Sequence, residues 1–198
     1  MTPTIRLATE RDVEQTQAIY APIVSNTAIS FELEPPPLEE MRQRILKTLQ
    51  KYPWLVCERD REILGYAYAS EHRVRAAYQW SVDVSVYVNE KMRRAGIGRA
   101  LYTSLFEILG LQGFYNAYAG ITLPNPASVG LHESLGFRPI GVYRAVGYKV
   151  GKWHDVGWWH LPLKEPSEHP ELPSELDKAK KHRVWESVLA AGLTHLRI

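Results

Sequence analysis

The spacing of hydrophobic and polar residues predicts helices and strands that interleave over the first 160 residues. Apolar residues recur at helical spacing over 12–24, with Thr9 as a cap, and again over 38–49 after three consecutive prolines. Two more helices are expected, one from Arg93 to about Leu109 and one over 127–135 that Gly136 ends as a left-handed cap. Short β-branched and aromatic runs predict strands over 5–7, 54–58, 63–70, 78–88, 115–121, 140–146 and 156–163. This order favours mixed α/β layers over a regular doubly wound fold.

The pattern changes at about residue 164. The stretch 164–173 holds three prolines and three acidic residues, which is typical of a linker. A helix is expected over 174–196, with a thin apolar stripe formed by Leu176, Val184, Val188 and Leu189. The chain is therefore predicted to consist of a domain over 1–163 and an appendage over 164–198. We expect the appendage to be dispensable for folding and activity.

Composition narrows the class of protein. The 24 basic and 22 acidic residues nearly balance, which disfavours a dedicated nucleic-acid binder. No run approaches the ~18 apolar residues of a membrane span, and the start of the chain lacks a signal peptide, so a cytoplasmic protein with no membrane partner is predicted. Cys57, the single cysteine, lies on a predicted buried strand, and the seven histidines show no metal-ligand spacing. No metal is therefore predicted.

The strongest chemical signal is a strand that leads into an arginine- and glycine-rich turn and then a helix. Its residues are Val86-Tyr87-Val88 followed by Arg93-Arg94-Ala95-Gly96-Ile97-Gly98-Arg99. The glycines allow the backbone to approach a ligand closely, and the free N–H groups of the helix start suit a pyrophosphate. A solvated surface loop is the alternative. The turn is neither a Walker loop nor a dinucleotide fingerprint, because Gly-Lys-Ser/Thr is absent and Leu101 replaces the third glycine.

The turn resembles the acetyl-CoA loop of the GNAT N-acetyltransferase superfamily. Asn125-Pro126-Ala127-Ser128 followed by Leu135-Gly136-Phe137 is similar to the second half of the cofactor site in that superfamily. Three further segments resemble the phosphinothricin / methionine sulfoximine acetyltransferase family: Tyr52-Pro53-Trp54-Leu55-Val56, Ala77-Tyr78-Gln79-Trp80 and Gly151-Lys152-Trp153-His154-Asp155-Val156-Gly157. The resemblance covers roughly residues 4 to 163 and leaves 164–198 without a counterpart.

The resemblance implies the GNAT fold, an α/β (α+β) architecture whose mixed central sheet is splayed into a V with helices on both faces. It also implies acetyl-CoA as co-substrate, with its pantetheine between strand 83–88 and strand 116–121. The residues that it assigns to acetyl-CoA are Val86, Tyr87, Val88, Arg93, Arg94, Ala95, Gly96, Ile97, Gly98, Arg99, Asn125 and Ser128.

Two titratable residues are the candidates for proton transfer. Asp83 lies within an apolar strand, where the resemblance places a general base, commonly Glu, that acts directly or through water. The shorter Asp favours a bridging water, and an exposed strand position is the alternative. His132 lies where many superfamily members have a Tyr that protonates the leaving thiolate, and imidazole titrates near neutrality. An exposed helix histidine is the alternative, and the sequence leaves open which of the two takes the amine proton.

The resemblance assigns substrate contacts to Arg73, Arg75 and Tyr78, before the Asp83 strand. Arginine offers a planar fork for a carboxylate or phosphinate. A solvated basic loop is the alternative. Phe31 is expected either to wall the same pocket or to lie in the core.

The leading hypothesis is acetylation of the amine of phosphinothricin, methionine sulfoximine or methionine sulfone by direct transfer. The alternatives are an acetyltransferase for another small amine or amino acid, and a non-catalytic acyl-CoA-binding module. The family resemblance also implies a homodimer, with Trp153, Trp158 and Trp159 as a candidate apolar contact. Trp153-His154-Asp155 is interpreted as mainly structural, because no nucleophile completes a triad.

Overall fold

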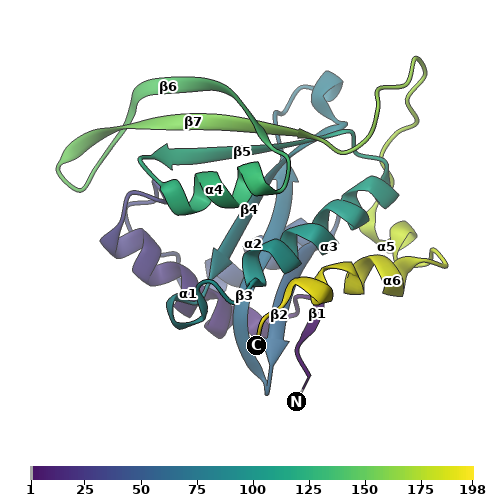
Figure 1. Cartoon of the computed structure of the whole chain (residues 1–198), viewed down its shortest axis with the longest axis horizontal. Helices are drawn as coiled ribbons and strands as arrows, with labels where there is room; N and C mark the ends of the chain where they lie inside the picture. Colours follow the sequence, from purple (N-terminus) through teal and green to yellow (C-terminus); the bar gives the residue numbers. More distant parts are fainter. Residues whose placement is uncertain (1) are drawn as a thin grey trace.

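The computed structural model describes residues 2–198, and its centre is one seven-stranded sheet of order β1-β2-β3-β4-β5-β7-β6 (Figure 1). The strands are β1 (Thr4–Leu7), β2 (Trp54–Arg59), β3 (Glu62–Glu71), β4 (Ser81–Val88), β5 (Asn116–Leu123), β6 (Arg138–Lys149) and β7 (Lys152–Pro162). All neighbouring strands are antiparallel except β4 and β5, which are parallel. The predicted mixed sheet is therefore confirmed.

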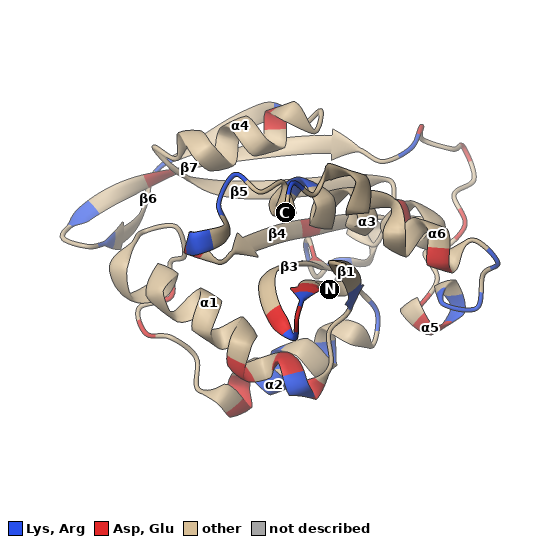
Figure 2. Ribbon diagram, turned by 60° about the horizontal axis from the view of Figure 1, so that its bottom comes forward, with Lys and Arg blue, Asp and Glu red and all other residues tan. Residues whose placement is uncertain are grey.

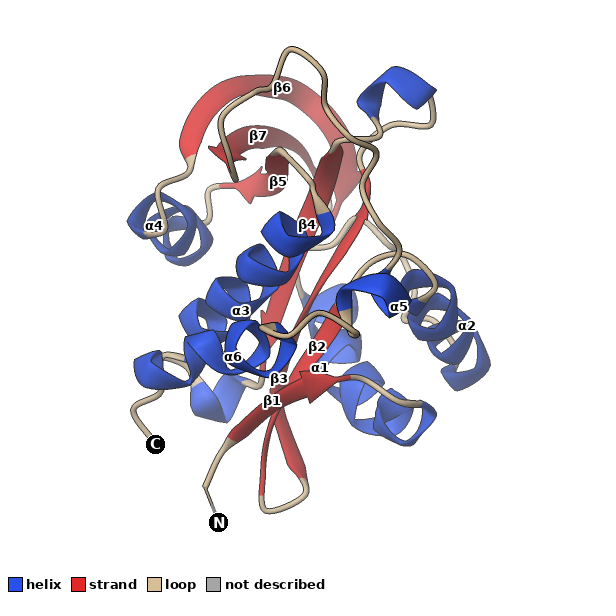
Figure 3. Cartoon of the chain, turned by 90° about the vertical axis from the view of Figure 1, so that its right-hand side faces the viewer, coloured by secondary structure: helices blue, strands red, loops and turns tan. Residues whose placement is uncertain are grey.

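Helices cover both faces of this sheet, as the resemblance implied. Helices α1 (Val13–Asn26) and α2 (Leu38–Leu49) lie on one face, and α3 (Ile97–Gln112) and α4 (Pro126–Ser134) lie on the other (Figure 3). The bounds of α2 match the sequence prediction. Gly136 takes the left-handed conformation expected of it, with φ 95°, just after α4.

The parallel pair β4–β5 is the point at which the sheet opens. Only three pairs of residues are in register, from Ser81↔Asn116 to Asp83↔Tyr118. Beyond Asp83 and Tyr118 the two strands are no longer paired with each other, although each continues for several residues. The sheet is thus splayed into a V whose apex lies at Asp83 and Tyr118.

Side chains alternate along β4, so that its apolar and its polar residues lie on opposite faces of the sheet. Val82 and Val84 are buried in the core that includes Ile97 and Leu101 of α3. Because successive side chains of a strand point to opposite faces, Asp83 points toward the face covered by α1. Tyr87 does so too, and its ring meets that of Tyr20 edge-on at 5.0 Å. The register of β4 therefore decides which face receives each group.

The structure corrects two sequence predictions near the site. Tyr78 does not begin the β4 strand, since it ends a short 3-10 helix, Ala76–Tyr78, and the strand starts at Ser81. The last two strands are longer than predicted and form a hairpin through Val150 and Gly151. The sequence signal failed there because the turn end of the hairpin lacks an alternating apolar pattern: Trp153 is exposed, whereas the polar His154 beside it is buried.

The appendage is packed onto the domain, contrary to the expectation of a separate continuous helix. It forms α5 (Leu176–Ala179), α6 (Trp185–Ala190) and a 3-10 turn (Ala191–His195) along α3 (Figure 1). Leu176, Ala179 and Trp185 are buried in the same core cluster as α3 and the sheet. The Ser104 hydroxyl of α3 bonds both the Leu189 carbonyl, at 2.8 Å, and the Gly192 N–H, at 3.0 Å.

Charges are mixed over the molecule. Figure 2 shows acidic and basic residues side by side on α2, where Arg42 pairs with Glu39 and Arg44 with Glu40. Within residues 2–198 no helix combines the length and apolar character needed to cross a bilayer.

Candidate active site

A narrow cleft opens where β4 and β5 diverge. It has a volume of about 60 Å³, and its lining comes from both faces of the splayed strands. The lining residues are Ile29, Val84, Ser85, Val86, Tyr87, Tyr102, Ala119, Gly120, Ile121, Thr122, Asn125, Ser128 and His132. The cleft therefore connects the α3–α4 face of the sheet with the α1–α2 face at the apex of the V.

The arginine- and glycine-rich turn takes the form that an anion site needs. Gly96 caps α3 in the left-handed region with φ 81°, and Arg94 is also left-handed with φ 65°. Within residues 2–198 the N–H groups of Ile97, Gly98 and Arg99 have no acceptor. Three free donors at the positive end of a 16-residue helix suit a phosphate group.

The end of the chain braces this turn from outside. The Arg197 N–H donates to the Ala95 carbonyl at 3.0 Å. A Cβ atom added at Gly96 would collide with the His195 carbonyl oxygen, in addition to being strained by its positive φ. Replacing Gly96 would therefore disturb the appendage as well as the ligand site.

The residues that the resemblance assigns to the second half of the cofactor site lie at the start of α4, close to α3. Asn125 caps α4 by accepting from the Ser128 N–H at 3.1 Å, and both residues line the cleft. Arg99 reaches across to α4, where its guanidinium donates to the Ser134 hydroxyl at 2.7 Å. Gly98 faces Leu131, and its lack of a side chain permits the two helices to approach closely.

His132 lies inside the cleft wall and is not an exposed helix residue, because it is only 3% exposed. Its Nδ1 lies 2.8 Å from the Ser128 carbonyl, so Nδ1 carries the proton and donates. Its Nε2 then accepts from the Tyr102 hydroxyl at 3.1 Å. Burial lowers the pKa of His132, against the raising effect of the Ser128 hydrogen bond, and the neutral ring is favoured.

Asp83 lies on the opposite face and has a partner that the sequence analysis missed. Its Oδ1 is 2.6 Å from Nδ1 of His72, and the His72 ring stacks on Tyr118 with 4.3 Å between ring centres. Burial raises the pKa of Asp83, while the His72 hydrogen bond and the charge of Arg73 oppose the rise. The only sequence signal for His72 was its place two residues beyond Ser70, which pairs with Asp83 across β3 and β4.

A cavity of about 250 Å³ adjoins this pair. It is lined by His72, Arg73, Tyr118, Ile140, Gly141, Tyr143 and Trp158. The Arg73 guanidinium lies over the Trp158 ring, 5.4 Å from its centre. Tyr78 lies edge-on to His72 at 6.0 Å, whereas the Arg75 side chain makes no hydrogen bond or ion pair with the described part of the chain. Arg73 and Tyr78 are therefore gathered at Asp83, and Arg75 remains on the exposed loop.

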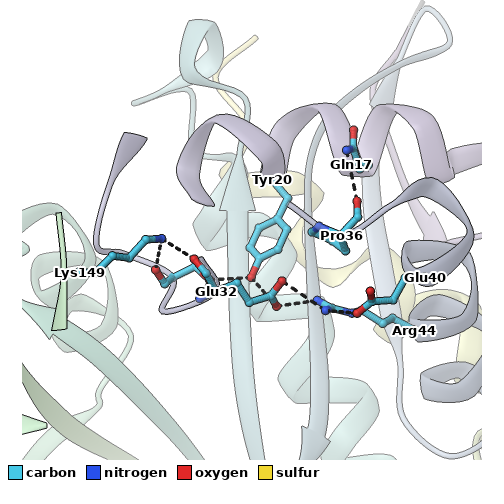
Figure 4. A network of polar contacts seen from close by, with 8 residues as sticks. Gln17, Tyr20, Glu32, Pro36, Glu40, Arg44 and Lys149 are labelled. Carbon is cyan, nitrogen blue, oxygen red and sulfur yellow. Dashed lines mark hydrogen bonds and ion pairs between the residues drawn. The ribbon is translucent and has the colours of Figure 1, made fainter. Parts of the chain in front are cut away.

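Phe31 lies against the β6–β7 hairpin and lines neither cavity. Its ring occupies the space that a side chain at Gly147 would need. Lys149 fixes the loop that carries Phe31, since its ammonium donates to the carbonyls of Val24, Ser30 and Glu32 at 2.6–2.8 Å. Figure 4 shows Lys149 beside Glu32. The Glu32 carboxylate continues the network to Tyr20 and Arg44 (Figure 4).

Other candidate chemistry lies outside the site. Cys57 is fully buried, and burial raises the pKa of its thiol to about 11. The segment Trp153-His154-Asp155 forms no dyad, because His154 bonds the Lys149 carbonyl and Asp155 pairs with Arg144. Among residues 2–198, no three His, Cys, Asp or Glu side chains gather as a metal site.

The fold and the cleft define an acetyltransferase of the GNAT class. The family model of the acetyltransferase (GNAT) domain matches residues 5–158. The chain belongs to this family, and the prediction of an acetyl-CoA-dependent N-acetyltransferase is confirmed.

Particular relatives agree with the narrower resemblance. Phosphinothricin N-acetyltransferase of Streptomyces viridochromogenes is 39% identical over 82% of this chain and 89% of its own length. The L-methionine sulfoximine/L-methionine sulfone acetyltransferase of Pseudomonas aeruginosa is 36% identical over 82% of this chain and 96% of its own. The crystal structure of a phosphinothricin acetyltransferase from Sinorhizobium meliloti in complex with acetyl-CoA superposes with a TM-score of 0.81, at 34% identity, and covers 89% of this chain and 99% of that chain.

Proposed function

We propose that this enzyme transfers the acetyl group of acetyl-CoA to the amine of a small amino acid of the phosphinothricin, methionine sulfoximine or methionine sulfone type. The observation that carries the proposal is the opening at Asp83 and Tyr118. One face of this opening holds the turn with free N–H groups, and the other holds a carboxylate beside an arginine-lined cavity. Donor and amine would enter from opposite faces and meet at the apex.

The two candidate proton-transfer groups receive different roles from their positions. Asp83 belongs to the amine side, where its carboxylate would assist the removal of the amine proton. His132, with Tyr102, belongs to the thioester side and serves the leaving thiolate. On the thioester side, the backbone of Val86, Tyr87 and Val88 and the flanking Asn125 and Ser128 would hold the pantetheine. The turn from Arg93 to Arg99 would hold the pyrophosphate.

The amine side offers a suitable surface for an amino acid. The Arg73 guanidinium would bind its carboxylate or phosphinate as a planar fork, and the aromatic rings of Tyr118, Tyr143 and Trp158 would pack against its side chain. Transfer would be direct from thioester to amine, because Cys57 is sealed in the core as a neutral thiol.

A screen of amines with acetyl-CoA, with detection of the free thiol, tests the function. Phosphinothricin, methionine sulfoximine and methionine sulfone should give turnover well above that with simple alkylamines that lack a carboxylate. Equal or greater turnover with the alkylamines would contradict the substrate class. An acetylated enzyme trapped by mass spectrometry in the absence of amine would contradict direct transfer.

We also propose a homodimer that forms through the edge strand β6. Of the tryptophans suggested from the sequence, only Trp153 is strongly exposed, at 64%, while Trp159 is buried within the chain. Instead, β6 presents a row of exposed apolar residues on an unpaired edge, namely Ile140, Val142, Tyr143, Val146 and Tyr148.

Light scattering at micromolar concentration should give twice the 22.7 kDa chain mass. Val146→Asp should shift the mass toward the monomer, because a buried, unpaired charge destabilises an interface. The exposed Leu172→Asp variant, far along the chain on the appendage, is the matched control. A monomer mass for the unmodified protein would refute the dimer.

A further inference from the structure

The partner of Asp83 is a histidine whose side chain lines the amine-side cavity and whose second ring nitrogen has no hydrogen-bond partner in the described residues. His72 Nδ1 is 2.6 Å from Asp83 Oδ1, and a carboxylate only accepts, so Nδ1 is the donor and carries the ring proton. In the neutral ring, Nε2 is then the nitrogen with a lone pair. No hydrogen-bond partner for Nε2 is present in residues 2–198, and the His72 side chain, 11% exposed, lines the cavity beside Arg73 and Trp158.

The ring is held in this orientation from several sides. It stacks on Tyr118 of β5 with the rings 15° from parallel, and meets Trp158 of β7 edge-on at 6.2 Å. Asp83 fixes its tautomer, as a carboxylate does for the histidine of a hydrolase triad. Tyr118 is also the residue paired with Asp83 at the apex of the V. His72 is therefore rigid at the place where amine and thioester would meet.

We propose that His72 is the general base of the transfer and that Asp83 is its positioning residue. The proposal rests on the proposed function. Nε2 of His72 takes the extra proton of the substrate ammonium, and the neutral amine forms the C–N bond as the C–S bond breaks. The second amine proton leaves with the sulfur as the thiol of CoA. The imidazolium then loses its proton to water, so the reaction yields one amide, one thiol and one released proton.

Geometry favours His72 over Asp83 as the proton acceptor. One Asp83 oxygen is already committed to His72, whereas Nε2 of His72 has no hydrogen-bond partner in the described residues and the His72 side chain lines the cavity. The groups that face the ring are Asp83 from β4, Arg73 from its own loop, Tyr78 from the 3-10 helix and Tyr118 from β5, with His160 beyond Tyr118. Only Asp83 and Arg73 carry charge at neutral pH. The charge of Asp83 therefore attracts a positive charge on the ring, and the charge of Arg73 repels it.

Substitutions that separate proton transfer from hydrogen bonding test the proposal. His72→Asn retains an N–H near the position of Nδ1 for Asp83 but has no basic nitrogen, so kcat/KM should fall about 100-fold or more. In His72→Ala, added imidazoles should restore turnover, with rates that rise with the pKa of the imidazole supplied. Exposed His169→Asn, on the appendage, is the matched control and should be unaffected.

The results separate a base from a structural residue. Full activity of His72→Asn, or rescue of His72→Ala that is independent of the pKa of the imidazole, would overturn the proposal and leave Asp83 as the base. An assay that fails with every amine would instead refute the proposed function. In that case ¹⁵N NMR of the His72 ring still tests the arrangement: in the neutral ring, Nδ1 should carry the proton and Nε2 should not. The opposite tautomer would overturn the proposal.

Discussion

Replacing Asp83 by asparagine should lower kcat/KM for acetyl transfer by about 100-fold or more at neutral pH, because positioned proton transfer is typically worth that much. The substitution should leave the fold intact, since an amide fills nearly the same volume as a carboxylate. The new NH₂ group can donate to Nδ1 of His72, and the ring proton then moves to Nε2. The ring would present a donor instead of a lone pair to the amine.

The direction in which activity changes with pH follows from the pKa of Asp83. The pKa of Asp83 is raised by burial, so its carboxylate is protonated at a higher pH than an ordinary aspartate, and activity should fall as the pH is lowered through that pKa. His132→Ala should cost a similar factor while it retains this acid-side fall, because His132 lies on the thioester face. Exposed Asp177→Asn is the control. Full activity of both Asp83→Asn and His132→Ala would show that the active site lies elsewhere.

Truncation after residue 173 should abolish or severely lower the cooperative thermal transition. The appendage buries Leu176, Ala179 and Trp185 against the domain, and loss of a buried Leu or Trp side chain typically costs about 2–5 kcal/mol each. Domains are stable by only ~5–15 kcal/mol in total. Truncation also leaves the Ser104 hydroxyl and an apolar face of α3 uncovered.

A single substitution makes the same test without deleting backbone. Trp185→Ala, at a side chain 8% exposed, should lower the melting temperature by roughly 10 °C. Leu172→Ala, at a side chain 68% exposed, should leave it nearly unchanged. A truncated protein with the full melting temperature and full acetyltransferase activity would restore the expectation that the segment is dispensable.

Sequence alone was sufficient where a local rule governs the structure. The four-residue spacing of Met41 and Ile45 specified α2 because helix periodicity depends on neighbours in the chain. The glycine before α3 specified the turn, since only glycine adopts the positive φ of Gly96 without strain. The glycine-containing turn, unlike the helix spacing, was also part of the resemblance to the GNAT superfamily.

Only the tertiary structure decided which side chains meet. Asp83 and His132 were equivalent as candidates in the sequence, and the alternation of β4 separated them onto opposite faces. His72 gained its role from Asp83, which is on another strand, and no local rule gives that contact. The weak apolar stripe of the appendage was insufficient to show its docking, because burial of Trp185 depends on a complementary face of α3. The spacing of apolar residues predicted most of the elements, and the motifs of the turn and of α4 carried the resemblance to the family, while packing between distant segments determined the surroundings of each residue.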